Sequence, residues 1–393
     1  MRELFRRNRQ LVIFLVVANL LHAFGHNVWR SLFNNFAVER IGVGEAMIGP
    51  IQAIREVPGL LAIGVAFLAL AFTEKRIMAV SLALLGVGIV LTGQSNSVWM
   101  LVTATLIMSF GFHYFNPGNN GLILMSMPHE QAPRAIGQLR SLGAIAAVLA
   151  SGSVVLFSDR LGYEALFMIV GITVLVGAVI LFVMGKQGTH DLPVKRKVKI
   201  RKRYWLFYTL TFLMGSRRHI FTTFAPFLLV QAFGVDVKLM SILILINSLA
   251  NIYVYQKVGK LVTKFGERAV LTFAFIVLIP IFLGYAYVKI LPLLCVLYVV
   301  DNVLFGFNLA IPTYLQKIAV SPEELTANMS LQETINHISA VAVPLLGSLV
   351  WVMFGSQAPF LIGVGIAILS LVLAQLMRTH IPKDDDGAVP AIG

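Results

Sequence analysis

Two adjacent arginines, Arg217 and Arg218, and the following His219 interrupt the otherwise apolar stretch 212-FLMGSRRHIFTTF-224. A guanidinium group presents a planar fork of donors that matches the oxygens of a carboxylate or a phosphate. At the centre of a membrane helix an arginine costs about 2.5–3.5 kcal/mol on insertion scales, so both side chains need a polar cavity or a partner. The stretch therefore indicates an anion-binding site, a buried ion pair, or both.

A second set of polar residues follows one face of a helix near the N-terminus. Asn19, His22, His26, Arg30 and Asn34 are three or four residues apart, a spacing that places them on one helical face. Neighbouring helices could satisfy such a stripe. Two histidines combined with an arginine favour a polar cavity instead, so His22, His26 and Arg30 are candidate substrate-binding residues.

Asp301 is the acidic residue of a later apolar run, which also carries Asn302 and Asn308. An unpaired carboxylate in hydrocarbon takes up a proton, because burial disfavours its charged form. Asp301 is therefore predicted to be the counter-ion of Arg217 or Arg218, a proton-coupling site, or both.

Further charged residues lie within other apolar runs. Arg55 and Glu56 point about 100° apart on a helix, so we expect them to satisfy each other poorly and to have a partner elsewhere. Arg140 and Glu333 could form an ion pair that closes an inner gate, or each could have a local partner. The candidate residues for proton coupling are Asp301, Glu56, Glu333 and His337.

The composition tells which elements must position these residues. Of 393 residues, 58% are hydrophobic and only 12% are charged, which indicates an integral membrane protein. The 31 Lys and Arg exceed the 18 Asp and Glu, but they lie in short segments between apolar runs, so nucleic-acid binding is not expected. With Cys295 as the only cysteine, no intramolecular disulfide can form.

Continuously apolar runs predict an all-α protein with twelve transmembrane helices, since a spanning helix needs about 20 apolar residues and barrel strands would alternate. The predicted spans are 11–37, 44–70, 77–94, 97–122, 134–157, 163–185, 204–231, 238–262, 268–288, 290–316, 325–352 and 356–378. The first run follows a basic start but lacks a convincing cleavage site, so it is interpreted as an uncleaved span.

Lysine and arginine gather in the loops on one side, which places both termini and the basic loop 186–203 in the cytoplasm. This loop is expected to anchor the topology near anionic lipid. It separates two six-helix halves, 1–185 and 204–378, and the polar tail 379–393 is expected to be disordered. The expected location is the inner membrane, with the protein as a monomer.

The two halves resemble each other in sequence. Matching segments are 110-FGFHYFNP-117 with 305-FGFNLAIP-312, 128-PHEQAPRAIGQL-139 with 322-PEELTANMSLQE-333, and the Gly-Val pairs at 42–43 and 234–235. Three matches in the same order at a nearly constant offset indicate an internal repeat. Repeated six-span halves are typical of secondary transporters that bind their substrate near the middle of the membrane.

Pro117 and Pro312 occupy equivalent positions of this repeat and are interpreted as a pair of helix kinks. His113 and Asn116 lie next to the first proline, three residues apart. They are candidate cavity residues in addition.

Two cytoplasmic stretches, 259-GKLVTKFGER-268 and 67-FLALAFTEKR-76, resemble a motif of the major facilitator superfamily, G-x-L-a-D-r-x-G-r-[rk]. The first of these keeps Gly259, Leu261, Gly266 and Arg268 but has Thr263 in place of the motif's Asp. The other keeps only the basic pair Lys75 and Arg76. The resemblance implies a cytoplasmic gate motif at these residues.

In proteins of that superfamily, spans one, four, seven and ten line the central cavity. By position, the resemblance would bring together His22, His26, Arg30, His113, Asn116, Arg217, Arg218, Asp301, Asn302 and Asn308. Cationic groups outnumber anionic ones in this set, so a small anionic or zwitterionic organic solute is expected. Alternating access, in which binding to one open state promotes closure of that side, is implied as well.

We therefore predict a proton-coupled secondary transporter for such a solute. The alternative is a multidrug or lipophilic-compound exporter, although 141-SLGAIAAVLASGSVVLF-157 lacks the Gly-Pro pair of the drug-antiporter motif. A non-transporting membrane sensor is a third possibility, which charges near the membrane midplane disfavour. No Walker-type phosphate loop or enzyme motif is present, so neither catalysis nor a cofactor is expected. No metal site is expected, because His22 and His26 lack Cys or carboxylate neighbours in sequence.

Overall fold

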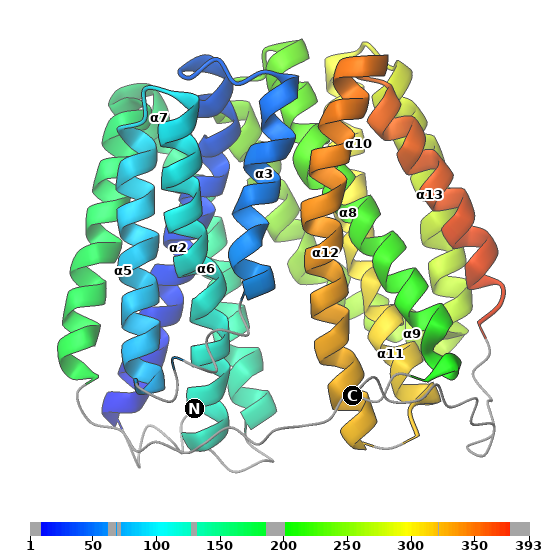
Figure 1. Cartoon of the computed structure of the whole chain (residues 1–393), viewed down its shortest axis with the longest axis horizontal. Coiled ribbons are helices and arrows are strands. Elements are labelled where there is room, and N and C mark those ends of the chain that lie inside the picture. The colour runs from blue at the N-terminus through cyan, green and yellow to red at the C-terminus, as the bar shows by residue number, and fades with distance from the viewer. Residues whose placement is uncertain are drawn as a thin grey trace. The chain divides into compact units, whose positions relative to one another are not determined.

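The computed structural model describes residues 9–61, 68, 72–126, 132–185, 201–320 and 322–377, and the elements in these ranges are helical (Figure 1). The long helices are α2 (Arg9–Glu39), α3 (Glu45–Leu60), α5 (Glu74–Gly93), α6 (Val98–Ser126), α7 (Ala132–Met184), α8 (Trp205–Phe233), α9 (Val237–Tyr287), α12 (Pro322–Phe354) and α13 (Ala358–Ala374). Shorter elements are η2 (Lys202–Tyr204), α10 (Leu291–Leu304), η3 (Phe305–Leu309) and α11 (Ala310–Ile318). The predicted all-α class is confirmed.

Two of these helices are each a pair of spans joined at a glycine. The backbone leaves helical geometry at Gly162 in α7, with φ of 71°, and at Gly266 in α9, with φ of 81°. Positive φ is readily available only to glycine, so each glycine sets the turn between two predicted spans. With α10, η3 and α11 taken as one interrupted span, the helices are consistent with the predicted twelve.

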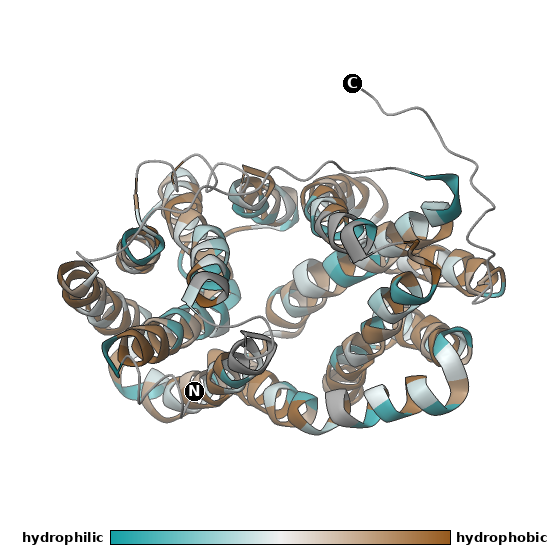
Figure 2. Cartoon of the chain, turned by 90° about the horizontal axis from the view of Figure 1, so that it is seen from below, coloured by the Kyte–Doolittle hydropathy of each residue, from teal (hydrophilic) through white to brown (hydrophobic). Residues whose placement is uncertain are grey.

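The surface of the helices suits a lipid environment. Eight described helices are long and apolar enough to cross a membrane, and Ala358–Ala374 is a shorter apolar helix. Hydrophobic residues predominate along the helices in Figure 2. Large apolar side chains such as Leu149 and Val183 on α7 are about three-fifths exposed, as expected for residues that face lipid. The chain is a multi-pass membrane protein.

The backbone differs around the two prolines that were expected to kink their helices. Pro117 lies inside α6, which continues as an α-helix on both sides of it. Before Pro312, the α-helix gives way to the 3-10 segment η3. Mid-helix 3-10 segments often mark functional positions, and this one begins four residues after Asp301.

The chain forms two compact units. Unit 1 comprises 1–43, 54–193 and 235–248, and unit 2 comprises 44–53, 194–234 and 249–393. In unit 1, α2, α5, α6 and α7 pack together, and in unit 2, α8 packs on α12 and α13. The division into halves at the central loop stays a prediction.

Each unit also holds a short segment from the other side of the central loop. In unit 2, the backbone N–H of Gly49 donates to the Ser348 hydroxyl at 2.9 Å. In unit 1, the Asn35 side chain donates to the Val235 carbonyl at 2.7 Å. The N-terminal part of α3 and the residues just before α9 are thereby fixed by buried hydrogen bonds to residues far away in sequence.

Glycines allow α5 and α6 to approach closely in unit 1. A Cβ atom at Gly111 of α6 would lie 2.3 Å from the backbone nitrogen of Leu85 and 2.4 Å from the carbonyl oxygen of Ser81. No side chain fits there unless the two helices separate. Small residues have this role in membrane proteins, where helix association depends on close packing.

Gly111→Ala should therefore destabilise the protein, by about 1–3 kcal/mol, because the added methyl group forces α5 and α6 apart. Gly152→Ala in α7 is a matched control, since a Cβ there meets nothing within 4 Å. In a helix, alanine is favoured over glycine by about 0.8–1.0 kcal/mol, so the control should be neutral or stabilising. Thermal unfolding of both purified variants measures the difference. Equal changes in stability for Gly111→Ala and Gly152→Ala would show that α5 and α6 are not in tight contact at Gly111.

Candidate functional site

The buried centre of unit 2 is an ion pair between α8 and α10. Arg217 Nη2 lies 2.6 Å from Asp301 Oδ1, and the two side chains are 2% and 0% exposed. The same nitrogen donates to the backbone carbonyl oxygen of Asp301 at 3.2 Å. Of the two counter-ions that the sequence left open for Asp301, the structure pairs it with Arg217.

Aromatic rings enclose the guanidinium group of this pair. Its Cζ atom lies 4.3 Å from the ring centroid of Phe305, the first residue of η3, which is a cation–π geometry. Phe221, one helical turn after Arg217, contacts both Phe305 and Tyr298. The aromatic rings exclude water from one side of the pair and so strengthen its electrostatic attraction.

Arg218 has a different environment although it is the next residue. Its side chain is exposed, and within the described residues it has no hydrogen bond or ion pair. Consecutive residues of a helix point about 100° apart, so the same helix can bury one guanidinium group and expose the other. Arg218 is therefore available to a ligand, and Arg217 is already neutralised.

Asparagines continue this polar region along α10 and η3. The Asn251 side chain of α9 donates to Asn302 Oδ1 at 2.9 Å, which fixes the Asn302 amide. Asn308 is half-buried, and its Oδ1 atom has no hydrogen-bond partner among the described residues. His219, which follows the arginines, is buried and has a partner.

Two predicted histidines of unit 1 belong to an aromatic stack between α2 and α6. The His22 ring stacks on Phe115 with centroids 4.2 Å apart, and the His26 ring stacks on Phe112 at 3.9 Å. His22 Nε2 lies 3.3 Å from the Phe112 carbonyl oxygen. His26 Nδ1 is buried and has no hydrogen-bond partner among the described residues.

The rest of the polar stripe on α2 has varied surroundings. Asn19 donates to Asn119 Oδ1 of α6 at 2.8 Å, so it is satisfied by a neighbouring helix. Arg30 is exposed and has a partner, and Asn34 is buried. The stripe is thus in part a helix–helix contact and in part accessible.

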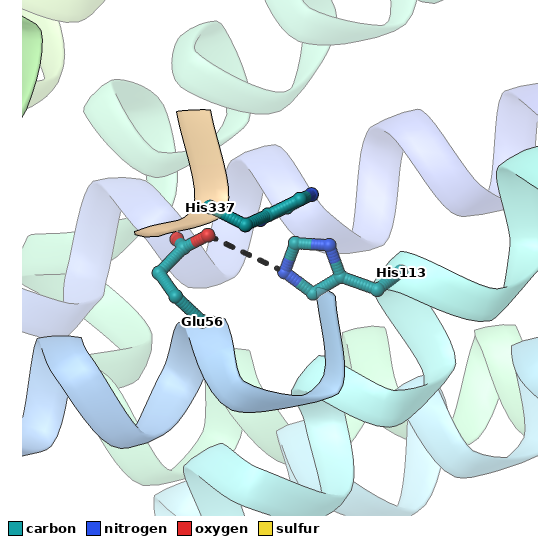
Figure 3. Close-up of side chains that lie close together, drawn as sticks. All are labelled: Glu56, His113 and His337. Carbon is teal, nitrogen blue, oxygen red and sulfur yellow. Dashed lines mark ion pairs between the residues drawn. The ribbon is translucent and has the colours of Figure 1, made fainter. Parts of the chain in front are cut away.

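Arg55, Glu56 and His113 form a polar cluster in unit 1 (Figure 3 shows Glu56 and His113). Arg55 Nη2 lies 2.7 Å from Glu56 Oε1, and His113 Nε2 lies 3.7 Å from Glu56 Oε2. The expectation that Arg55 and Glu56 would satisfy each other poorly was wrong, because long side chains bend across the 100° between them. The expected partner on another helix exists and is His113 of α6.

The remaining predicted residues differ in exposure. Asn116 and Glu333 are exposed and His337 is half-buried, while the side chain of Arg140 lies outside the described residues. Lys75 and Arg76 open α5, and Gly259 lies in α9 before its bend at Gly266. Arg268 donates to Gln375 Oε1 at 3.0 Å, close to the end of α13.

Sequence reasoning missed several residues around these sites. Phe305 lies over the Arg217 guanidinium group, but an aromatic residue in an apolar run gives no separate signal. Glu267 is 2% exposed and pairs with Lys317 of α11 at 2.8 Å. Its position inside the motif copy, next to Arg268, could have indicated that pair.

The ion pair predicts unequal effects of single and double substitutions. Arg217→Met should lower stability by about 3–5 kcal/mol, because it leaves the Asp301 carboxylate buried without a counter-ion. The double variant Arg217→Met/Asp301→Leu should recover most of that loss. Thermal unfolding in detergent measures both.

The exposed pair Lys238–Asp159, with side chains 47% and 62% exposed, serves as the control. Lys238→Met should cost at most about 1 kcal/mol. If the double variant loses as much stability as Arg217→Met and Asp301→Leu lose together as single variants, the two residues do not interact.

Comparison with known proteins agrees with the architecture. The multidrug resistance protein MdtG of Escherichia coli strain K12 is 24% identical over 328 residues, which are 79% of each chain. The solved structure of the nucleoside transporter NupG has a TM-score of 0.73 at 16% identity and covers 93% of this chain and 98% of that one. A bacterial homologue of the human lysosomal transporter Spinster, inward-facing and occupied, has a TM-score of 0.74 at 14% identity, with coverages of 95% and 97%. At such identities the structures show a shared fold.

The family itself follows from the sequence. A profile described as Major Facilitator Superfamily matches residues 15–321, well over half of the chain. The protein thus belongs to the Major Facilitator Superfamily of membrane transporters.

Proposed function

We propose that this transporter carries a small anionic or zwitterionic organic solute by alternating access, coupled to protons. Arg218 would anchor the anionic group, and Asp301 would carry the proton. The observation that carries the proposal is the unequal pair of arginines on α8: Arg217 is buried against Asp301, and Arg218 is exposed without a partner among the described residues.

The charge balance supports an anionic group on the substrate. Arg217 is neutralised by Asp301, and Arg55 is neutralised by Glu56. Arg218 then remains as an accessible cation in the middle of an apolar helix, where its own insertion cost favours an anion beside it. That His22, His26 and Arg30 of unit 1 contact the same substrate stays a prediction.

The ion pair also supports proton coupling. Asp301 is fully buried, so its charge is tolerated only while Arg217 remains beside it. When an α-helical rearrangement weakens that contact, the carboxylate lowers its free energy by taking up a proton. A transport cycle that alternately makes and breaks this pair would carry one proton with each turnover.

A multidrug or lipophilic-compound exporter is the second candidate. The curated relative MdtG is named a multidrug resistance protein, and the stacked rings of His26 and Phe112, which are both half-buried, offer a face to which flat apolar compounds could bind. This candidate would not need the exposed cation at Arg218.

The protein would lie in the inner membrane as a monomer with both termini in the cytoplasm, as the lysine and arginine distribution predicts. It would transport without catalysis and without a cofactor. Lys75, Arg76, Gly259, Gly266 and Arg268 would form the cytoplasmic gate motif.

A thermal-shift screen of the purified protein tests the substrate class. Organic anions should stabilise the wild type, by about 2.7 kcal/mol at a ligand concentration one hundred times Kd. Arg218→Ala should abolish that shift, while Arg160→Ala, at an exposed arginine outside the site, should keep it. Stabilisation by cationic lipophiles alone would overturn the anion proposal and favour the exporter.

Reconstituted vesicles test the coupling. With an anion found in the screen, wild type should move protons along with solute, as a pH-sensitive dye in the vesicle lumen reports. Asp301→Asn should lose net proton movement but keep solute exchange, and Asp159→Asn, at the exposed pair, should keep both. Proton movement by Asp301→Asn equal to that of wild type would contradict the role of Asp301.

A further inference from the structure

One face of α9, within unit 2, changes from apolar to basic as the helix approaches its bend at Gly266. Spaced four, four, three and four residues apart, the residues on this face are Leu249, Tyr253, Lys257, Lys260 and Lys264. Such spacing keeps them within an arc of about 80° around the helix. All five side chains are exposed, those of Leu249 and Tyr253 to 51% and 62%. We call this surface the basic face of α9.

The order of residues along the basic face matches the layers of one bilayer leaflet. An exposed leucine suits hydrocarbon, tyrosine is enriched where hydrocarbon meets the headgroups, and lysine ammonium groups suit the headgroup layer. The lysines lie on the side that the distribution of Lys and Arg predicts to be cytoplasmic, where anionic lipids create a negative surface potential. The basic face therefore fits a layer of lipid headgroups better than open solvent.

Aromatic rings hold two of the ammonium groups next to apolar surface. Lys257 Nζ lies 5.0 Å from the ring centroid of Tyr253, and Lys264 Nζ lies 5.1 Å from that of Phe265, both cation–π geometries. Phe265 is 56% exposed, and Leu261 of the same helical turn is 36% exposed. Positive charge and exposed apolar groups thus lie side by side. A phospholipid is complementary to both, because it carries a phosphate group and acyl chains.

The lysines of the basic face are not neutralised by the protein itself. Glu267 is the only acidic residue of α9, and it is 2% exposed and pairs with Lys317 of α11 at 2.8 Å. Among the described residues, the side chains of the three lysines have no ion pair and no hydrogen bond. Three ammonium groups on one helical face repel each other, so an anion beside them lowers the electrostatic free energy.

We propose that the basic face of α9 binds the headgroup of an anionic phospholipid of the cytoplasmic leaflet. The ammonium groups of Lys257, Lys260 and Lys264 donate hydrogen bonds to the phosphate oxygens, and Leu261 and Phe265 contact the acyl chains. The lipid is anionic because a zwitterionic headgroup carries a cation of its own, which the three lysines repel. This binding is independent of the proposed substrate site and of proton coupling.

Native mass spectrometry of the purified full-length protein in detergent, with added lipid, tests the surface. Wild type should bind phosphatidylglycerol more tightly than phosphatidylcholine with the same acyl chains. Lys257→Gln/Lys260→Gln/Lys264→Gln should bind phosphatidylglycerol more weakly by at least about tenfold, because each lysine near anionic lipid adds to the attraction. Lys257→Arg/Lys260→Arg/Lys264→Arg keeps the charge and should keep the binding.

A variant with the same loss of charge elsewhere separates the basic face from net charge. Arg40→Gln/Arg160→Gln/Lys289→Gln changes three exposed residues outside α9 and should bind phosphatidylglycerol as wild type does. Equal affinity of wild type and the glutamine variant of the basic face, both folded by circular dichroism, would overturn the proposal. An equal loss of affinity in the two glutamine variants would overturn it too, as would equal affinity of wild type for the two lipids.

Discussion

The burial of two opposite charges against each other in an apolar protein interior is the constraint on which the rest depends. Arg217 and Asp301 are almost entirely inaccessible, and their contact distance is 2.6 Å. Neither charge is tolerable alone in that place, since an unpaired buried ion costs several kcal/mol. The helices α8 and α10 and the 3-10 segment η3 must therefore keep the pair together, and any rearrangement that separates it must supply a proton or another counter-ion.

Because of this constraint, the two neighbouring arginines have different roles. Arg217 belongs to the protein's own charge balance, while Arg218 is free among the described residues to meet an anion. A substrate that binds beside Arg218 alters the field at Arg217, and so at Asp301. Substrate and proton would influence each other without sharing an atom. In unit 1, by contrast, Glu56 already neutralises Arg55, and the histidines are fixed by stacking.

Hydropathy alone predicted the helical class and the twelve spans, because a membrane helix needs a long apolar run and little else. The resemblance to the superfamily, seen in 259–268, was confirmed by the match over 15–321. The details of the site depended on geometry that sequence does not contain. As consecutive residues of a helix, Arg217 and Arg218 point about 100° apart. The sequence does not tell which of the two side chains faces the core. The Arg55–Glu56 contact depends on side-chain bending, and Phe305 is indistinguishable in sequence from a packing residue.

Proton binding by the purified protein tests the central claim most directly. The protein in weakly buffered detergent is titrated from alkaline to acidic pH, and the protons bound per molecule are counted with an indicator dye. If Asp301 carries the proton, wild type should bind one more proton than Asp301→Asn. Identical proton counts for the two proteins, both folded, would contradict the account, since the buried carboxylate would then never take up a proton.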